Sequence, residues 1–148
     1  MHLDSRQLLS TSLFLASLAG LASAQSANVL WQDVRDGIAN ADDQHNAVVA
    51  TADGGVVLCG VTYEEFPPSS GQLVPRTLVR SLAANGQVRW TRVYSTGVWG
   101  AAVPTRIALQ PSGRVVVGGT SDFGEDWFVA AYEPNGTLAF EGLWDLNS

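Results

Sequence analysis

The chain contains no lysine and only one cysteine. Its eight basic residues are all arginines, they face fourteen acidic residues, and the formal net charge is −6. Binding to nucleic acid needs a basic stripe that displaces counterions, and attraction to anionic lipids needs a basic cluster. The composition therefore argues against a nucleic-acid partner and against an anionic membrane surface as a partner.

A single cysteine also excludes a disulfide within the chain, so the fold must be stabilised by packing. Cys59 lies in the apolar run Val56-Val57-Leu58-Cys59-Gly60, and this setting predicts a small buried residue. The alternatives for an unpaired cysteine in a secreted protein are an intermolecular disulfide or a reactive thiol.

Long apolar runs are scarce, and the clearest one, from residue 8 to residue 21, is close to the N-terminus. It is followed by Ala22-Ser23-Ala24, which fits the small-x-small rule for signal-peptide cleavage. We therefore predict a signal peptide over residues 1–24, a mature chain that starts at Gln25, and a secreted or periplasmic location. An uncleaved anchor is the alternative, but the run is shorter than the roughly 20 residues that span a bilayer. No membrane insertion is expected after cleavage.

What the chain does have is glycine, at 15 positions, and an internal repeat. The segment 31–94 reads again over 90–144. In the first copy Ala52–Gly60 leads to Leu82–Trp90, and in the second copy Pro111–Gly119 leads to Tyr132–Phe140. A repeat of this length, built from short apolar stretches and glycine turns, is typical of propellers and other β-arrays.

The repeat predicts an all-β domain over residues 25–148, with about two four-stranded antiparallel units and one extra leading strand, Val29–Val34. The expected strands are Asn46–Thr51, Val56–Val61, Thr77–Leu82 and Gln87–Tyr94 in the first unit, and Thr105–Gln110, Arg114–Thr120, Trp127–Tyr132 and Thr137–Trp144 in the second. The polar stretch 33–43 is expected to be a loop between units.

Turn residues separate these strands at matching places. Asn85-Gly86 and Asn135-Gly136 predict hairpins, because both residue types tolerate a positive φ. The pairs Val88/Trp90 and Leu138/Phe140 are each two residues apart, so we expect each pair to lie on one face of its sheet.

The two units differ in the connection Tyr63–Pro75, which is longer than its counterpart in the second unit. Insertions in repeats often form a binding face. We therefore expect a ligand-binding loop here, with Tyr63 and Phe66 as contact residues. Trp99 lies in a connection without a match in the first unit and is the other surface candidate.

Acidic residues at corresponding ends of the two units are the only candidate metal ligands. They are Asp42, Asp43, Asp122, Glu125 and Asp126. Carboxylates suit Ca²⁺, which takes six or more oxygen ligands, but the spacing is not that of an EF-hand. The alternative is that these residues cap turns and keep the surface soluble. No other cofactor is expected.

Two further kinds of chemistry have weaker support. His45 lies near Asp42 and Asp43 and could act as a general base, although a solvated loop histidine explains it as well. The five tryptophans could stack on sugars or flank a quinone, but for Trp31 and Trp90 the matching strand positions are explained more simply by core packing.

The order of these motifs resembles a bacterial secreted β-propeller repeat family. The matching residues are Trp31, Asp42-Asp43, Asp53-Gly54-Gly55, Gly60-Val61-Thr62, Asn85-Gly86 and Trp90–Tyr94, then Gly118-Gly119-Thr120 and Asp126–Val129. The similarity covers residues 31–144, and Phe140 replaces the third tryptophan. The resemblance implies a secreted scaffold or binding module.

Two blades cannot close a propeller, which needs roughly 4–8 blades. Either several copies assemble into a homo-oligomeric ring, or the chain is a remnant of a longer propeller. We expect an exported binding or structural module for a protein or carbohydrate ligand. The alternatives are a fragment of a secreted propeller enzyme of the quinoprotein or hydrolase kind, and a degenerate remnant without function.

Overall fold

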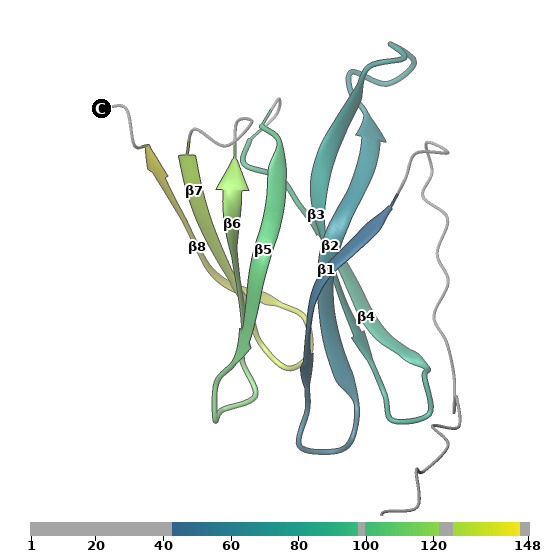
Figure 1. Ribbon diagram of the computed structural model, residues 1–148, viewed down its shortest axis with the longest axis vertical. Helices are drawn as coiled ribbons and strands as arrows, with labels where there is room; N and C mark the ends of the chain where they lie inside the picture. Colours follow the sequence, from purple (N-terminus) through teal and green to yellow (C-terminus); the bar gives the residue numbers. More distant parts are fainter. Residues whose placement is uncertain (1–42, 98–99, 122–125, 146–148) are drawn as a thin grey trace, which may run out of the picture.

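The computed structural model describes residues 43–97, 100–121 and 126–145, and within them the chain is all-β. Eight strands form two four-stranded antiparallel sheets, each a meander in which neighbours in sequence are neighbours in the sheet (Figure 1). Sheet A consists of β1 (Gln44–Ala50), β2 (Val56–Glu65), β3 (Leu73–Leu82) and β4 (Val88–Tyr94), and sheet B of β5 (Ala102–Leu109), β6 (Val115–Ser121), β7 (Asp126–Tyr132) and β8 (Leu138–Asp145). The expected leading strand Val29–Val34 and the leader 1–24 lie outside the described residues.

The prediction of four antiparallel strands per unit is confirmed, and the two sheets repeat one another in detail. Each has a β-bulge in its first strand, between His45 and Ala47 in β1 and between Pro104 and Arg106 in β5. A glycine faces each bulge across the ladder, Gly60 in sheet A and Gly119 in sheet B. A Cβ atom at either glycine would overlap the backbone of the bulged strand. The bulges therefore explain why both units need glycine at this place.

The predicted Asn-Gly hairpins are present, but the asparagines serve a different purpose from the one expected. Only the glycines take a positive φ, 82° at both Gly86 and Gly136. Asn85 Oδ1 instead accepts a hydrogen bond from the backbone N–H of Gln87 at 3.1 Å. The equivalent bond to Asn135 Oδ1 comes from the N–H two residues later, at 2.9 Å. Each asparagine thus stabilises its turn through its side chain.

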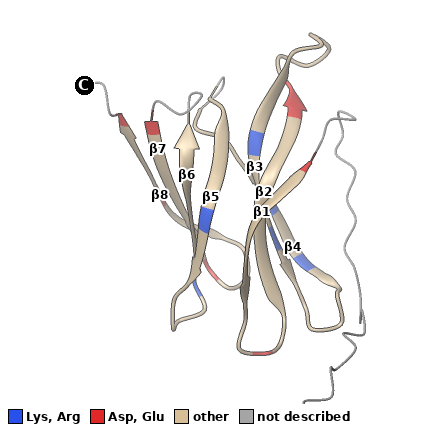
Figure 2. Cartoon of the chain, viewed as in Figure 1, with Lys and Arg blue, Asp and Glu red and all other residues tan. Residues whose placement is uncertain are grey.

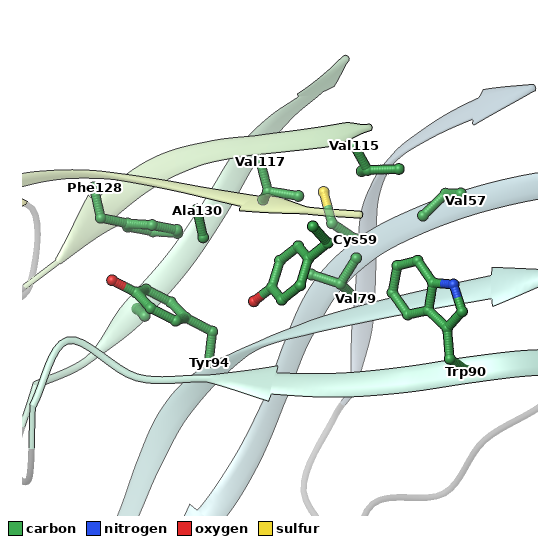
Figure 3. Packing of buried hydrophobic residues seen from close by; sticks show 11 residues of the cluster. Val57, Cys59, Val79, Trp90, Tyr94, Val115, Val117, Phe128 and Ala130 are labelled. Atoms are coloured by element: carbon green, nitrogen blue, oxygen red, sulfur yellow. The ribbon is translucent and has the colours of Figure 1, made fainter. Parts of the chain in front are cut away.

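The hydrophobic core lies between the two sheets (Figure 3). Its buried members are Val57, Cys59, Val79, Trp90 and Tyr94 from sheet A, and Ala102, Val115, Val117, Phe128, Ala130 and Tyr132 from sheet B. The ring centroids of Tyr94 and Phe128 are 5.2 Å apart. Since β5 lies beside β1 and β2 (Figure 1), the sheets are packed face to face with their first strands adjacent.

Cys59 is a member of this core, so its environment within one copy of the chain is defined. Its thiol is free and fully buried, and burial raises its pKa to about 11. A thiol with a raised pKa in an enclosed site is a poor nucleophile. The expectation of a small buried residue is confirmed.

The expectation that Val88 and Trp90 share a face is wrong. A second bulge places Val88 opposite Leu82 and Trp90 opposite Ser81. Leu82 and Ser81 are consecutive in β3 and face opposite sides of the sheet. Accordingly Trp90 is buried in the core while Val88 is 46% exposed.

The same correction applies in sheet B. A bulge between Ala131 and Tyr132 places Leu138 opposite Tyr132 and Phe140 opposite Ala131. Leu138 and Phe140 therefore lie on opposite faces of β8, against the expectation from their spacing.

The long connection of the first unit is also not simply a loop. β2 and β3 continue pairing to Glu65 and Leu73, so that Tyr63 lies opposite Pro75 within a regular ladder. Only residues 66–72 form the turn. The extra residues therefore lengthen a hairpin that projects beyond the rest of sheet A (Figure 1).

Candidate functional site

A cleft opens between the two sheets at the end where the short hairpin turns gather. Its volume is about 460 Å³, within the range of small-ligand sites. Sheet A contributes Thr51, Ala52, Asp53, Val57, Ser81, Arg89 and Trp90, and sheet B contributes Leu109, Gln110, Pro111, Gly113, Val115 and Pro134. Neither unit alone could form this cleft, because its two walls come from different copies of the repeat.

An ion pair forms the charged part of the sheet A wall. Arg89 Nη2 donates to Asp53 Oδ2, joining β4 to the turn between β1 and β2. The acidic turn and the basic residues of β4 are visible in Figure 2. Arg89 is the bulged residue of β4, and bulges commonly redirect a side chain beside a site. The bulge therefore turns a strand arginine toward the cleft.

Asp53 is held in place by its neighbours as well as by Arg89. Thr51 Oγ1 donates to Asp53 Oδ1 at 2.6 Å, and the N–H of Gly55 donates to the same oxygen at 3.3 Å. The Thr51 hydroxyl, the Arg89 guanidinium and the Gly55 N–H together lower the pKa of Asp53 from 3.8 to about 2. The carboxylate is thus ionised and oriented at neutral pH.

The apolar wall is fixed by Trp90, which bridges the two sheets. Its indole Nε1 donates to the carbonyl oxygen of Pro134 at 2.9 Å. Arg92 Nε donates to the carbonyl oxygen of Gly136 at 2.7 Å. A Cβ atom at Gly136 would contact the Trp90 ring at 2.7 Å, so the glycine permits the close approach. The expectation that Trp90 is a core residue is confirmed, and its edge also lines the cleft.

We expect the stability contributed by Asp53 to depend on acid pH. Because its folded pKa is below the unfolded value, the contribution is present above about pH 4 and is lost as the pH falls toward about 2. Asp53→Asn should lower the urea midpoint at pH 7, and the two proteins should converge near pH 2. Urea titrations at both pH values measure this. In an Arg89→Gln background, Asp53→Asn should lower the urea midpoint at pH 7 by a smaller amount. An unchanged midpoint for Asp53→Asn at pH 7 would contradict the stabilising role of the Asp53 carboxylate.

The sequence-based ligand candidates Tyr63 and Phe66 are both half-buried, and they belong to the long hairpin rather than to the cleft. The Phe66 ring has the Arg76 guanidinium 5.8 Å above its centroid. Arg76 is itself buried and donates from Nη1 to the carbonyl oxygen of Gly100 at 2.6 Å. One face of Phe66 is therefore already occupied within the chain.

The tip of this hairpin is ordered by its own hydrogen bonds. The N–H of Phe66 donates to the carbonyl oxygen of Gln72 at 2.8 Å, and the N–H of Gly71 donates to Glu65 Oε1. Residues 67–72 are exposed. The tip is therefore held in shape by contacts within the hairpin, and Tyr63 and Phe66 are not its most exposed parts.

Only some of the other predicted site residues lie within the described ranges. Asp43 immediately precedes β1 of sheet A and Asp126 begins β7 of sheet B, so they belong to different units. Asp42, Asp122, Glu125 and Trp99 lie outside the described residues. Neither carboxylate oxygen of Asp43 accepts a hydrogen bond from any residue in the described ranges, although both are enclosed. Within those ranges, no three His, Cys, Asp or Glu side chains come together in a way that could hold a metal. His45 is exposed on β1.

Sequence reasoning missed the cleft. It treated Asp53 as a turn residue and gave Arg89 no role, because the ion pair depends on a bulge that the apolar pattern does not reveal. The usable signal was the repeat itself, since the walls of a cleft between units come from matching hairpins.

A scan against protein-family models and a search of curated protein sequences found no match to this chain. In the part of the chain that the structure describes, no helix is long and apolar enough to cross a membrane.

Proposed function

We propose that this protein is an exported binding module built from two consecutive blades of a β-propeller repeat, and that its ligand occupies the cleft between them. The blade arrangement is supported by three features of the sheets. Both are four-stranded meanders, they carry bulges at the same places, and they pack face to face with β1 and β5 adjacent. The apolar run followed by Ala22-Ser23-Ala24 supports export.

The observation that carries the binding function is the composition of the cleft. One part of its wall is apolar, formed by Trp90, Leu109 and Pro134, and another part is the Asp53–Arg89 pair. Ligand sites commonly combine an apolar wall with a few oriented polar groups. A sugar unit matches this arrangement, because its ring carbons suit the apolar wall and its hydroxyls suit a carboxylate and a guanidinium. We therefore propose a carbohydrate ligand.

Binding to a glycan array of neutral and uronic-acid oligosaccharides tests this proposal. We expect at least one class of probe to bind, and Arg89→Gln to weaken that binding at least tenfold, which corresponds to about 1.4 kcal/mol for a hydrogen-bonded charged group. Arg106→Gln is the matched control, because Arg106 is an exposed arginine outside the cleft. The proposal fails if no probe binds, or if both substitutions weaken binding equally.

Export is tested separately by the mass of the protein recovered outside the cytoplasm of an expressing host. A mature chain beginning at Gln25 is expected. A full-length chain that remains in the cytoplasm would contradict the exported location without affecting the glycan result.

A further inference from the structure

Sheet B has a second face, directed away from sheet A, which we call the outer face of sheet B. Side chains alternate along a strand, so this face is formed by the residues that come between the core residues of sheet B. Its members are Arg106 and Ala108 of β5, Val116, Gly118 and Thr120 of β6, Trp127, Val129 and Ala131 of β7, and Phe140, Gly142 and Trp144 of β8. Arg106, which lines the hollow of this face, is the single charged side chain among these residues.

Three large aromatic residues on this face are open to solvent. Trp127 is 58% exposed, Trp144 is 50% exposed and Phe140 is 49% exposed. Trp127 and Trp144 are direct cross-strand partners, and together with Gly118 they bound a shallow hollow of about 720 Å³. Exposed aromatic side chains gathered on one face are characteristic of an interaction surface.

Comparison of equivalent rows in the two sheets indicates what the outer face of sheet B is suited to contact. The row Thr77–Tyr94 of sheet A corresponds to the row Trp127–Trp144 of sheet B, since each is the pairing of third and fourth strands at the same ladder position. In the same way the row Ser81–Trp90 corresponds to Ala131–Phe140. In sheet A these rows are buried against sheet B. The outer face of sheet B therefore has the pattern of an established sheet-to-sheet interface.

The opposite end of the molecule differs from this face, because its centre is closed. On the side of sheet A that faces away from sheet B, the central residues Leu58, Leu78 and Leu82 are 8%, 1% and 0% exposed. Stacking of copies into a ring would require both end faces to be open, because each copy would contribute a different face to each contact. Open apolar residues on that side of sheet A lie only at its margins, where Val48, Val88 and Val93 are 64%, 46% and 42% exposed. Among the described residues, the outer face of sheet B is therefore the sheet face whose aromatic rows are open.

We propose that two copies of this chain associate through the outer faces of their B sheets, like with like, into a two-fold dimer. In such a contact each aromatic row packs on the partner copy, and Trp127 or Trp144 of one copy enters the hollow of the other. Two-fold pairing buries the outer face of sheet B in both copies, so no further copy can be added through this face. This proposal does not depend on the ligand cleft, which lies between the two sheets of one copy.

The size of the face predicts a weak association. Four strands of about seven residues cover on the order of 450 Å² per copy, from the usual spacing between strands and rise per residue. The total of about 900 Å² is below the standard size of stable interfaces and within the range of weak complexes. We therefore expect a dimer that forms with increasing concentration, with the tryptophans supplying most of the binding energy.

Sedimentation equilibrium over about a hundredfold concentration range tests the proposal. The sample is the protein purified from an expressing host, without further truncation. We expect a monomer–dimer equilibrium, and Trp127→Ser or Trp144→Ser should each raise the dissociation constant at least about tenfold. Both side chains are half exposed, so the circular dichroism spectrum and the urea midpoint of each variant should stay close to those of the unchanged protein.

Val48→Ser is the matched control, because Val48 is 64% exposed on the opposite face of sheet A. It should leave the dissociation constant unchanged. Equal weakening by Val48→Ser and by the tryptophan variants would indicate head-to-tail stacking and would overturn like-with-like pairing. A chain that remains monomeric at the highest concentration, or a dimer that both tryptophan variants leave intact, would overturn the proposal altogether.

Discussion

Alanine at Gly60 or at Gly119 is expected to lower the free energy of unfolding by about 3 kcal/mol, the upper part of the range for overpacked positions. In sheet A the new Cβ would overlap the carbonyl oxygen of Gln44, and in sheet B that of Val103. Both obstacles are backbone atoms of a paired strand, so relief requires the bulged strand to move rather than a side chain to rotate. Urea unfolding followed by circular dichroism measures the change at each position.

Gly118→Ala is the control for this pair of variants. Gly118 precedes Gly119 in β6, but a Cβ there would have the carbonyl oxygen of Phe128 at 3.7 Å as its nearest contact. That is an ordinary van der Waals distance, so the cost should stay within about 0.5 kcal/mol. If Gly119→Ala were as mild as Gly118→Ala, the close approach of β5 to β6 would be wrong.

The same glycines show how far the sequence could predict the fold. Local signals were sufficient for most of the fold. The strand positions predicted from glycine turns and apolar runs are close to those of all eight strands in the described residues. The bulges were not predictable in this way, because they arise where two strands meet. Val88 and Trp90 demonstrate the consequence, as a single bulged residue between them moves one side chain to the opposite face.

The candidate site was less predictable than the fold for a related reason. Asp53 and Arg89 are 36 positions apart, and their contact depends on the turn between β1 and β2 and on the bulge in β4. The sequence showed the connection Tyr63–Pro75 as an insertion, yet in the structure most of the inserted residues extend β2 and β3. Pairing of β2 with β3 satisfied its backbone hydrogen bonds, which a free loop would have left to water.

Phe128→Ala is expected to lower the free energy of unfolding by about 3–5 kcal/mol, the usual range for truncating a buried aromatic residue. Phe128 is 1% exposed and packs between the sheets, with its ring 5.2 Å from that of Tyr94. Removing the ring would leave a cavity that the surrounding strands cannot fill without shifting the two sheets. The measurement is the urea midpoint and slope from combined near- and far-ultraviolet circular dichroism.

Trp127→Ala provides the comparison at the neighbouring position. Trp127 precedes Phe128 in β7 but faces the opposite side of sheet B and is 58% exposed. Its removal deletes more atoms than the removal of the phenylalanine ring, yet little of that surface is buried within one copy, so we expect a change within about 1 kcal/mol at low protein concentration. A larger loss for Trp127→Ala than for Phe128→Ala would place the core on the wrong face of sheet B. Equal and small losses would mean that the sheets do not pack through Phe128, and the cleft between them would then lose its structural basis.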